Sequence, residues 1–124
     1  MTIRPGSIVV VHLTNPTEKF WGVLQELAMT GVYLRGISLS SFDDWMAEAV
    51  RGRDQTLGLC AMFVPLFRVE RIFLDEPVGE VESYQQRFSR RVGMPVESYL
   101  RLAGEDGGGG GGGEGGEESG EVPS

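Results

Sequence analysis

The sequence predicts a mainly β domain with added helices, of the α+β class, in which five short strands curl into one small closed barrel. Three observations favour this fold. Residues 20–37 resemble two strands joined by a tight turn, residues 57–74 hold two more extended apolar runs, and residues 42–51 carry an apolar stripe with a helical period. With a first strand at residues 8–13, one helix is inserted between strands three and four.

The hairpin at residues 20–37 is the centre of this prediction. On its first strand Trp21, Val23 and Leu27 are expected to share one face, and the opposite face is also largely apolar. Gly31 is expected to supply the positive φ of a three-residue hairpin loop. A strand that is apolar on both faces indicates burial on both sides.

An amphipathic helix is expected at residues 42–51, after the hairpin. Its apolar stripe includes Trp45, which should point toward the sheet. Ser40 or Ser41 should cap the start, and acidic residues in the first turn with arginines at the end complement the helix dipole.

The fourth and fifth strands are expected at residues 57–64 and 69–74, separated by one turn that begins at Pro65. Residues 57–64 are apolar on both faces, so this strand must be covered on both sides by its own chain or by a partner. Such a short link turns the chain sharply, as the corner of a small barrel requires.

Two short helices are expected before a tail of different composition. Ser83 begins a capping box for the first helix, which should end at Gly93, and a second helix should start at Pro95. Residues 1–103 are predicted to form one domain. Residues 104–124 are almost all glycine and glutamate, with too little apolar surface to fold, so a disordered acidic tail is expected.

The charge is unevenly distributed along the chain. All 11 basic residues lie within residues 1–103 together with 12 of the 18 acidic ones, so this body is nearly neutral and the acidity belongs to the tail. No apolar run is long enough to span a membrane, and the start does not resemble a signal peptide. The single cysteine excludes an internal disulfide, so a cytoplasmic location is expected.

Four features of the strands resemble Sm-like and SH3-like small β-barrels. They are the Gly-x-Leu pattern at Gly22 and Leu24, a return strand led by a glycine, the turn at Pro65 between strands four and five, and the Pro5-Gly6 entry into strand one. Gly22 and Gly36 lie inside strands, which suits sharp bending or close backbone approach in a small barrel. The chain is also similar in style to uncharacterised small bacterial proteins, a likeness that implies no activity.

The resemblance to Sm-like proteins implies ring assembly through strands four and five, and RNA binding. Ala28 stands near the position of that family's loop aspartate, and Gly31 or Val32 near that of its base-contacting asparagine. Because neither residue type is present, uridine-type base reading is not expected.

No pattern typical of catalysis or of a bound cofactor is found. Cys60, in the apolar fourth strand, is expected to be buried and inert, and His12 is the single histidine. Asp75 and Glu76 are interpreted as a solvated turn. We therefore expect no enzyme activity, no metal site, no cofactor and no small-molecule substrate.

Two functions remain open. The preferred one is a binding or assembly module that self-associates or binds a protein through the strand 4/5 region, using Leu57, Leu59, Ala61 and Phe63. The alternative is a nonspecific binder of RNA or single-stranded nucleic acid, modulated by the acidic tail. Its candidate phosphate contacts are Arg35, Arg68, Arg71, Arg87, Arg90 and Arg91. A contiguous positive patch would favour the alternative, and scattered ion pairs the preferred function.

Overall fold

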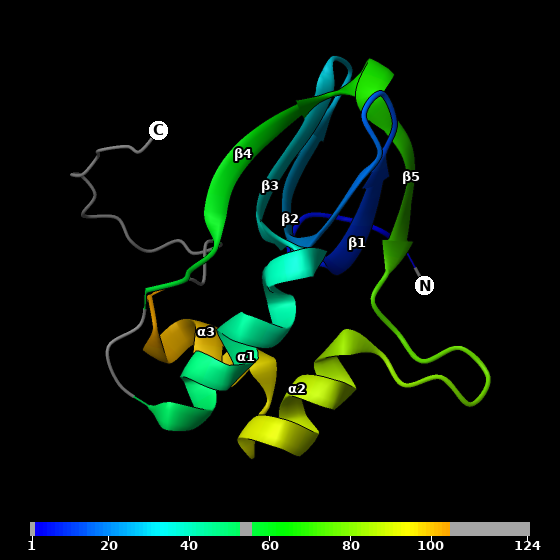
Figure 1. Cartoon of the computed structure of the whole chain (residues 1–124). Helices are drawn as coiled ribbons and strands as arrows, with labels where there is room; N and C mark the ends of the chain where they lie inside the picture. The colour runs from blue at the N-terminus through cyan, green and yellow to red at the C-terminus, as the bar shows by residue number, and fades with distance from the viewer. Residues whose placement is uncertain (1, 53–55, 105–124) are drawn as a thin grey trace.

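The computed structural model describes residues 2–52 and 56–104, and within them the chain forms an antiparallel five-stranded sheet and three α-helices (Figure 1). The strands are β1 (Ile8–Leu13), β2 (Glu18–Ala28), β3 (Gly31–Ser38), β4 (Cys60–Pro65) and β5 (Val69–Leu74). The helices are α1 (Phe42–Arg51), α2 (Tyr84–Val92) and α3 (Val96–Leu102), with 3-10 turns η1 (Leu39–Ser41) and η2 (Leu66–Arg68). The predicted tail lies outside the described residues except for Gly104.

The sheet has the strand order β4-β3-β2-β1-β5, with every neighbouring pair antiparallel. β4 and β5 stand at its two ends, and no hydrogen-bonded pairing joins them in the described part of the chain. The sheet is therefore open between these strands, and the predicted closure is not observed. The single turn η2 brings their ends together, but each strand then follows its own neighbour, β3 or β1.

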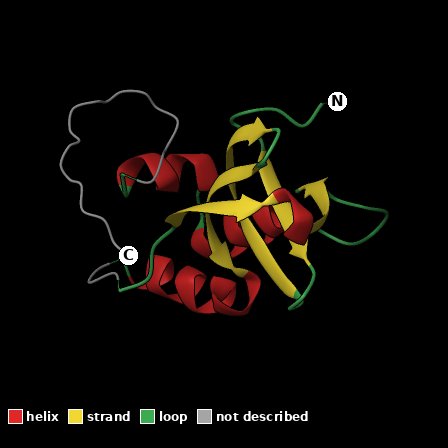
Figure 2. Cartoon of the chain, turned by 90° about the horizontal axis from the view of Figure 1, so that it is seen from above, coloured by secondary structure: helices red, strands yellow, loops and turns green. Residues whose placement is uncertain are grey.

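Two apolar cores lie on the two faces of the sheet. In β1, Val9 and Val11 belong to one core and Val10 to the other, as the alternation of a strand requires. The first core is a cluster of aliphatic side chains inside the curled strands. The second joins the opposite face to the helices, which gather at one end of the sheet while η2 and the strand turns lie at the other (Figure 1). Seen from above, the strands are strongly curled (Figure 2).

β2 contains an irregularity that changes which residues share a face. The register shifts between Leu24 and Glu26, so that Leu27 lies opposite Val32, a member of the aliphatic core. Trp21 belongs to the helix-facing core. The prediction that Leu27 shares the face of Trp21 was therefore wrong, because one extra residue reverses the alternation beyond it.

The β2–β3 loop is shorter than predicted. β2 ends at Ala28 and β3 begins at Gly31, which leaves Met29 and Thr30 between them, and Gly31 is not among the glycines with positive φ. Glycine is required there for space instead. A Cβ atom would overlap the Val64 carbonyl oxygen and lie 2.5 Å from Cζ of Phe63.

Helix α1 has the predicted bounds, and Trp45 is buried at the contact between helices and sheet. Its ring lies 5.4 Å from that of Trp21. The N-cap residue is Ser41, but its side chain makes no capping hydrogen bond; the hydroxyl of Ser38 accepts from the Ser40 N–H at the start of η1 instead. Because η1 leads directly into α1, the serine cap acts one turn earlier than expected.

Helices α2 and α3 pack on α1 of their own chain. The predicted capping box of Ser83 and Gln86 starts α2, and Gly93 ends it in the left-handed conformation. Phe88 of α2 and Tyr99 of α3 place their rings 5.2 and 5.7 Å from Trp45. The three helices thus share one aromatic core. Among the described residues, no helix combines the length and apolar character that crossing a bilayer demands.

Glu48 is a buried carboxylate on α1 that holds the start of the segment leading to β4. It accepts hydrogen bonds from the backbone N–H groups of Thr56 (2.8 Å) and Leu57 (2.9 Å), and from the Thr56 hydroxyl. The hydroxyl contact, followed by the Leu57 N–H, lowers the pKa of Glu48 below its usual value. These contacts favour the ionised carboxylate in the folded state.

This pKa shift predicts a loss of stability in acid. Because the folded pKa lies below the unfolded one, the contribution of Glu48 is complete above the unfolded pKa and disappears as the pH falls through the folded pKa. We expect Glu48→Gln to lower the melting temperature at neutral pH and to flatten its decline toward acid. Thermal melting followed by circular dichroism, from neutral pH into acid, measures this effect, and Glu26→Gln at an exposed position is the control. If the melting temperatures of Glu48→Gln and of the wild type declined in parallel with pH, the prediction would be contradicted.

Candidate functional site

The end of the sheet opposite the helices carries large apolar side chains that are open to solvent. Phe67 is 84% exposed and Met29 is 95% exposed, both far above what core residues show. We call this surface the apolar end; its members are Leu27, Met29, Tyr33, Phe63, Leu66 and Phe67. A grouped apolar surface of this kind is typical of an interaction site.

The β2–β3 loop, the turn η2 and the adjoining ends of β2, β3 and β4 form the apolar end. The Leu66 N–H donates to the Thr30 carbonyl oxygen at 2.9 Å and so ties η2 to the β2–β3 loop. On the adjoining strands the rings of Tyr33 and Phe63 lie 4.9 Å apart. These contacts make the apolar end one continuous part of the fold rather than a set of isolated side chains.

The apolar end lies next to two free sheet edges. β4 pairs only with β3, and β5 pairs only with β1, in the part of the chain that the structure describes. The outer backbone groups of both strands therefore have no strand partner there. Such edges can accept an added strand from another chain.

The four residues predicted for self-association are divided between surface and core. Ala61 and Phe63 lie on β4 and are exposed. Leu59 is only 7% exposed and belongs to the helix-facing core, against which Leu57 is also packed. Since β4 starts at Cys60, the predicted strand 57–64 began too early, and its first apolar residues are covered by the chain itself.

The arginines of β3, η2 and β5 contact other groups of the protein. Arg35 donates to the Leu59 carbonyl oxygen at 3.2 Å. Arg68 donates to the carbonyl oxygens of Thr14 and Pro16 and pairs with Glu18 at 3.1 Å. Arg71 contacts its neighbour Glu70 at 3.5 Å. Each of the three guanidinium groups thus has its own protein partners.

The arginines of α2 are divided between packing and solvent. Arg87 pairs with Asp43 at 3.1 Å and stacks over the rings of Phe42 and Tyr84. Arg90 pairs with Glu82, and Arg91 is exposed. Arg87 thus ties α2 to α1, and its guanidinium is already engaged.

Cys60 and His12 are not brought together. Cys60 is exposed on β4, contrary to the expected buried position, because that strand is at a sheet edge. His12 lies on β1, where its ring meets Phe73 edge-on at 4.8 Å. Burial lowers the pKa of His12, the positive charges of Lys19 and Arg71 lower it further, and Glu70 partly opposes them. Neither residue has the base–nucleophile geometry that covalent catalysis needs.

Asp75, interpreted from the sequence as part of a solvated turn, is buried and lies where three elements meet. Its carboxylate accepts from the indole N–H of Trp21 (2.9 Å) and from the backbone N–H groups of Tyr84 (2.8 Å) and Gln85 (2.9 Å). It therefore joins β5, β2 and the start of α2. The nearby capping box marked where α2 begins, but no local pattern indicated that Asp75 would reach it.

The described residues hold no group of three or more metal-ligating side chains that could bind an ion. Comparison with known proteins adds no relatives: no family model, no curated protein and no solved structure significantly matches this chain.

Proposed function

We propose that the chain is a non-catalytic assembly module that self-associates, or binds a protein partner, through its β4–η2–β5 region. The observation that carries the proposal is the apolar end, where Phe67 is 84% exposed beside two free sheet edges. Burying these side chains against another chain removes apolar surface from water, and an added strand would satisfy the edge backbone groups.

The proposal includes a relationship to Sm-like and SH3-like small barrels. Support comes from the single-turn link between β4 and β5 and from the aliphatic core inside the curled strands. In this proposal the two edges meet the edges of neighbouring copies. A surface that joins a different surface on the next copy builds a ring or a filament.

Nucleic-acid binding has less support from the side-chain contacts. Arg35, Arg68 and Arg71 each contact groups of their own chain, which would compete with phosphates for these guanidinium groups. Salt-sensitive binding of single-stranded RNA by the full chain would favour this alternative.

Self-association can be measured by sedimentation of the full chain at tens of micromolar. We expect oligomers that dissociate on dilution, and we expect Phe67→Asp to weaken the association by at least about tenfold, because a charge would be buried at the contact. Val50→Asp is the matched control, since Val50 is 52% exposed on α1, away from the apolar end. A monomeric wild-type chain, or equal association of the two variants, would contradict self-association through this surface.

A further inference from the structure

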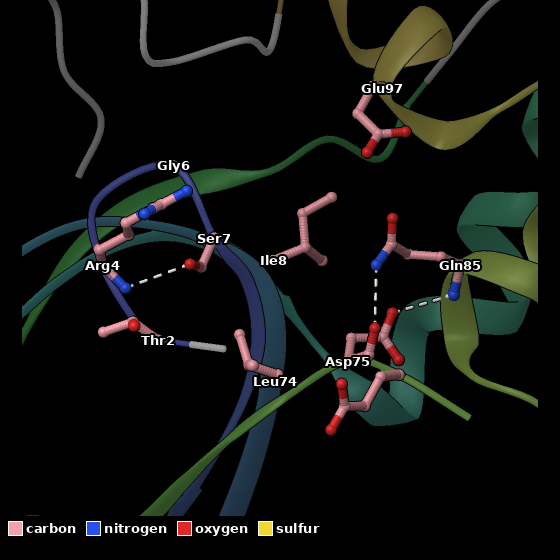
Figure 3. A pocket seen from close by; sticks show the side chains of 10 residues that line it. Thr2, Arg4, Gly6, Ser7, Ile8, Leu74, Asp75, Gln85 and Glu97 are labelled. Carbon is pink, nitrogen blue, oxygen red and sulfur yellow. Dashed lines mark hydrogen bonds between the residues drawn. The ribbon is translucent and has the colours of Figure 1, made fainter. Parts of the chain in front are cut away.

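A second surface feature lies near the helix end of the molecule, away from the apolar end. It is a cavity of about 480 Å³ between the N-terminal turn, the end of β5 and the first turns of α2 and α3 (Figure 3). This volume falls in the range of small-molecule sites. Its lining combines the aliphatic side chains of Ile8 and Leu74 with charged groups of both signs.

The positive side of the cavity is Arg4, which a fixed turn holds in place. The Arg4 N–H donates to Oγ of Ser7 at 3.1 Å, and the Ser7 N–H donates to the Arg4 carbonyl oxygen at 2.9 Å. Two backbone hydrogen bonds join this turn to Leu24 of β2. The Gly6 N–H donates to the Leu24 carbonyl oxygen, and the Leu24 N–H donates to the Ser7 carbonyl oxygen, each at 2.8 Å. The base of the arginine side chain is therefore positioned by the sheet.

The negative side carries Glu97 and Glu76. Figure 3 shows Glu97 across the cavity from Arg4, with Ile8 between them. No ion pair or hydrogen bond within the described residues engages the side chains of Arg4, Glu76 or Glu97, whereas Arg68 of η2 and Arg87 of α2 are paired with carboxylates. The Gln85 amide beside them is fixed by its hydrogen bond to the Asp75 carbonyl oxygen at 2.9 Å.

We propose that this cavity binds a small zwitterion with an aliphatic body, namely a free amino acid or a short peptide. The Arg4 guanidinium presents a fork of donors suited to a carboxylate. Glu97 and Glu76 accept hydrogen bonds from an ammonium group. Ile8 and Leu74 cover the aliphatic body. A ligand with only one of the two charges leaves the opposite wall unpaired, so both charges are needed for full affinity.

The proposal can be tested by NMR titration of the ¹⁵N-labelled full chain. The probes are L-leucine, the dipeptide leucyl-leucine, leucinamide, which lacks the carboxylate, and N-acetyl-leucine, which lacks the ammonium group. We expect at least one zwitterion to shift the amide signals of residues 4–8 and Gln85 in a saturable way, and both single-charge analogues to bind at least about tenfold more weakly. Tighter binding of leucine would identify the ligand as a free amino acid, and tighter binding of leucyl-leucine would identify it as a short peptide.

Variants separate the two walls of the cavity. Arg4→Gln should weaken zwitterion binding about tenfold while leaving the binding of leucinamide unchanged. Glu97→Gln should also weaken zwitterion binding about tenfold, while leaving the binding of N-acetyl-leucine unchanged. Arg91→Gln, at an exposed arginine outside the lining, is the control. No shifts with either zwitterion at about 10 mM, or wild-type affinity in Arg4→Gln, would overturn the proposal. Neither result bears on assembly through the apolar end.

Discussion

Alanine at Gly22 is expected to destabilise the domain by about 3 kcal/mol, a large part of the total stability of a small protein. Gly22 of β2 lies opposite Gly36 of β3 in the antiparallel pairing of these two strands. A Cβ at Gly22 would overlap the Arg35 carbonyl oxygen and lie 2.5 Å from Cα of Gly36. Both obstacles are backbone, so no side chain can rotate away, and the two central strands would have to separate.

Gly79→Ala is the matched control for this prediction. Gly79 has φ +58° and nothing within 4 Å of an added Cβ, so alanine there meets backbone strain without a steric clash. We expect a cost of about 1 kcal/mol. Urea unfolding of both variants gives the two values. Equal midpoints for Gly22→Ala and Gly79→Ala would show that β2 and β3 are not held in this close contact.

Replacing Asp75 with alanine is the second change with a large expected effect, about 3 kcal/mol or more. It would leave the buried indole N–H of Trp21 and the first N–H groups of α2 without their acceptor, and each unsatisfied buried donor costs about 1–3 kcal/mol. Asp75→Asn keeps one acceptor oxygen and should cost less. In the Asp75→Ala variant, the helices should detach from the sheet more readily than the sheet itself unfolds.

Trp21→Phe makes the contribution of one contact measurable. It removes the indole donor while keeping an aromatic ring, so a double-mutant cycle with Asp75→Ala should give a coupling of about 1–2 kcal/mol. Glu76→Ala is the control, because this exposed neighbour lies outside the hydrogen-bonded network, and its effect should stay within about 0.5 kcal/mol. Additive effects of the Trp21 and Asp75 changes would contradict a direct hydrogen bond between them.

The elements of the fold could be predicted from the sequence because their signals are local. The β-branched run of residues 8–13, the helical stripe of residues 42–51 and the capping box at Ser83 each depend on neighbours within a few residues. The inward position of Trp45 followed from the same stripe. Interruptions of a pattern are harder to foresee, and the bulge after Leu24 reversed the face of Leu27.

The candidate surfaces depend on contacts between segments far apart in the chain. Phe67 and Met29 form one apolar end only because η2 bonds to the β2–β3 loop, and Leu59 is buried because the helices cover it. The sequence alone determined the order and approximate positions of the strands and helices, since propensity, periodicity and caps act over short separations. Only the tertiary structure decided that Asp75 is a buried junction and which apolar residues remain exposed, since these depend on which segments meet.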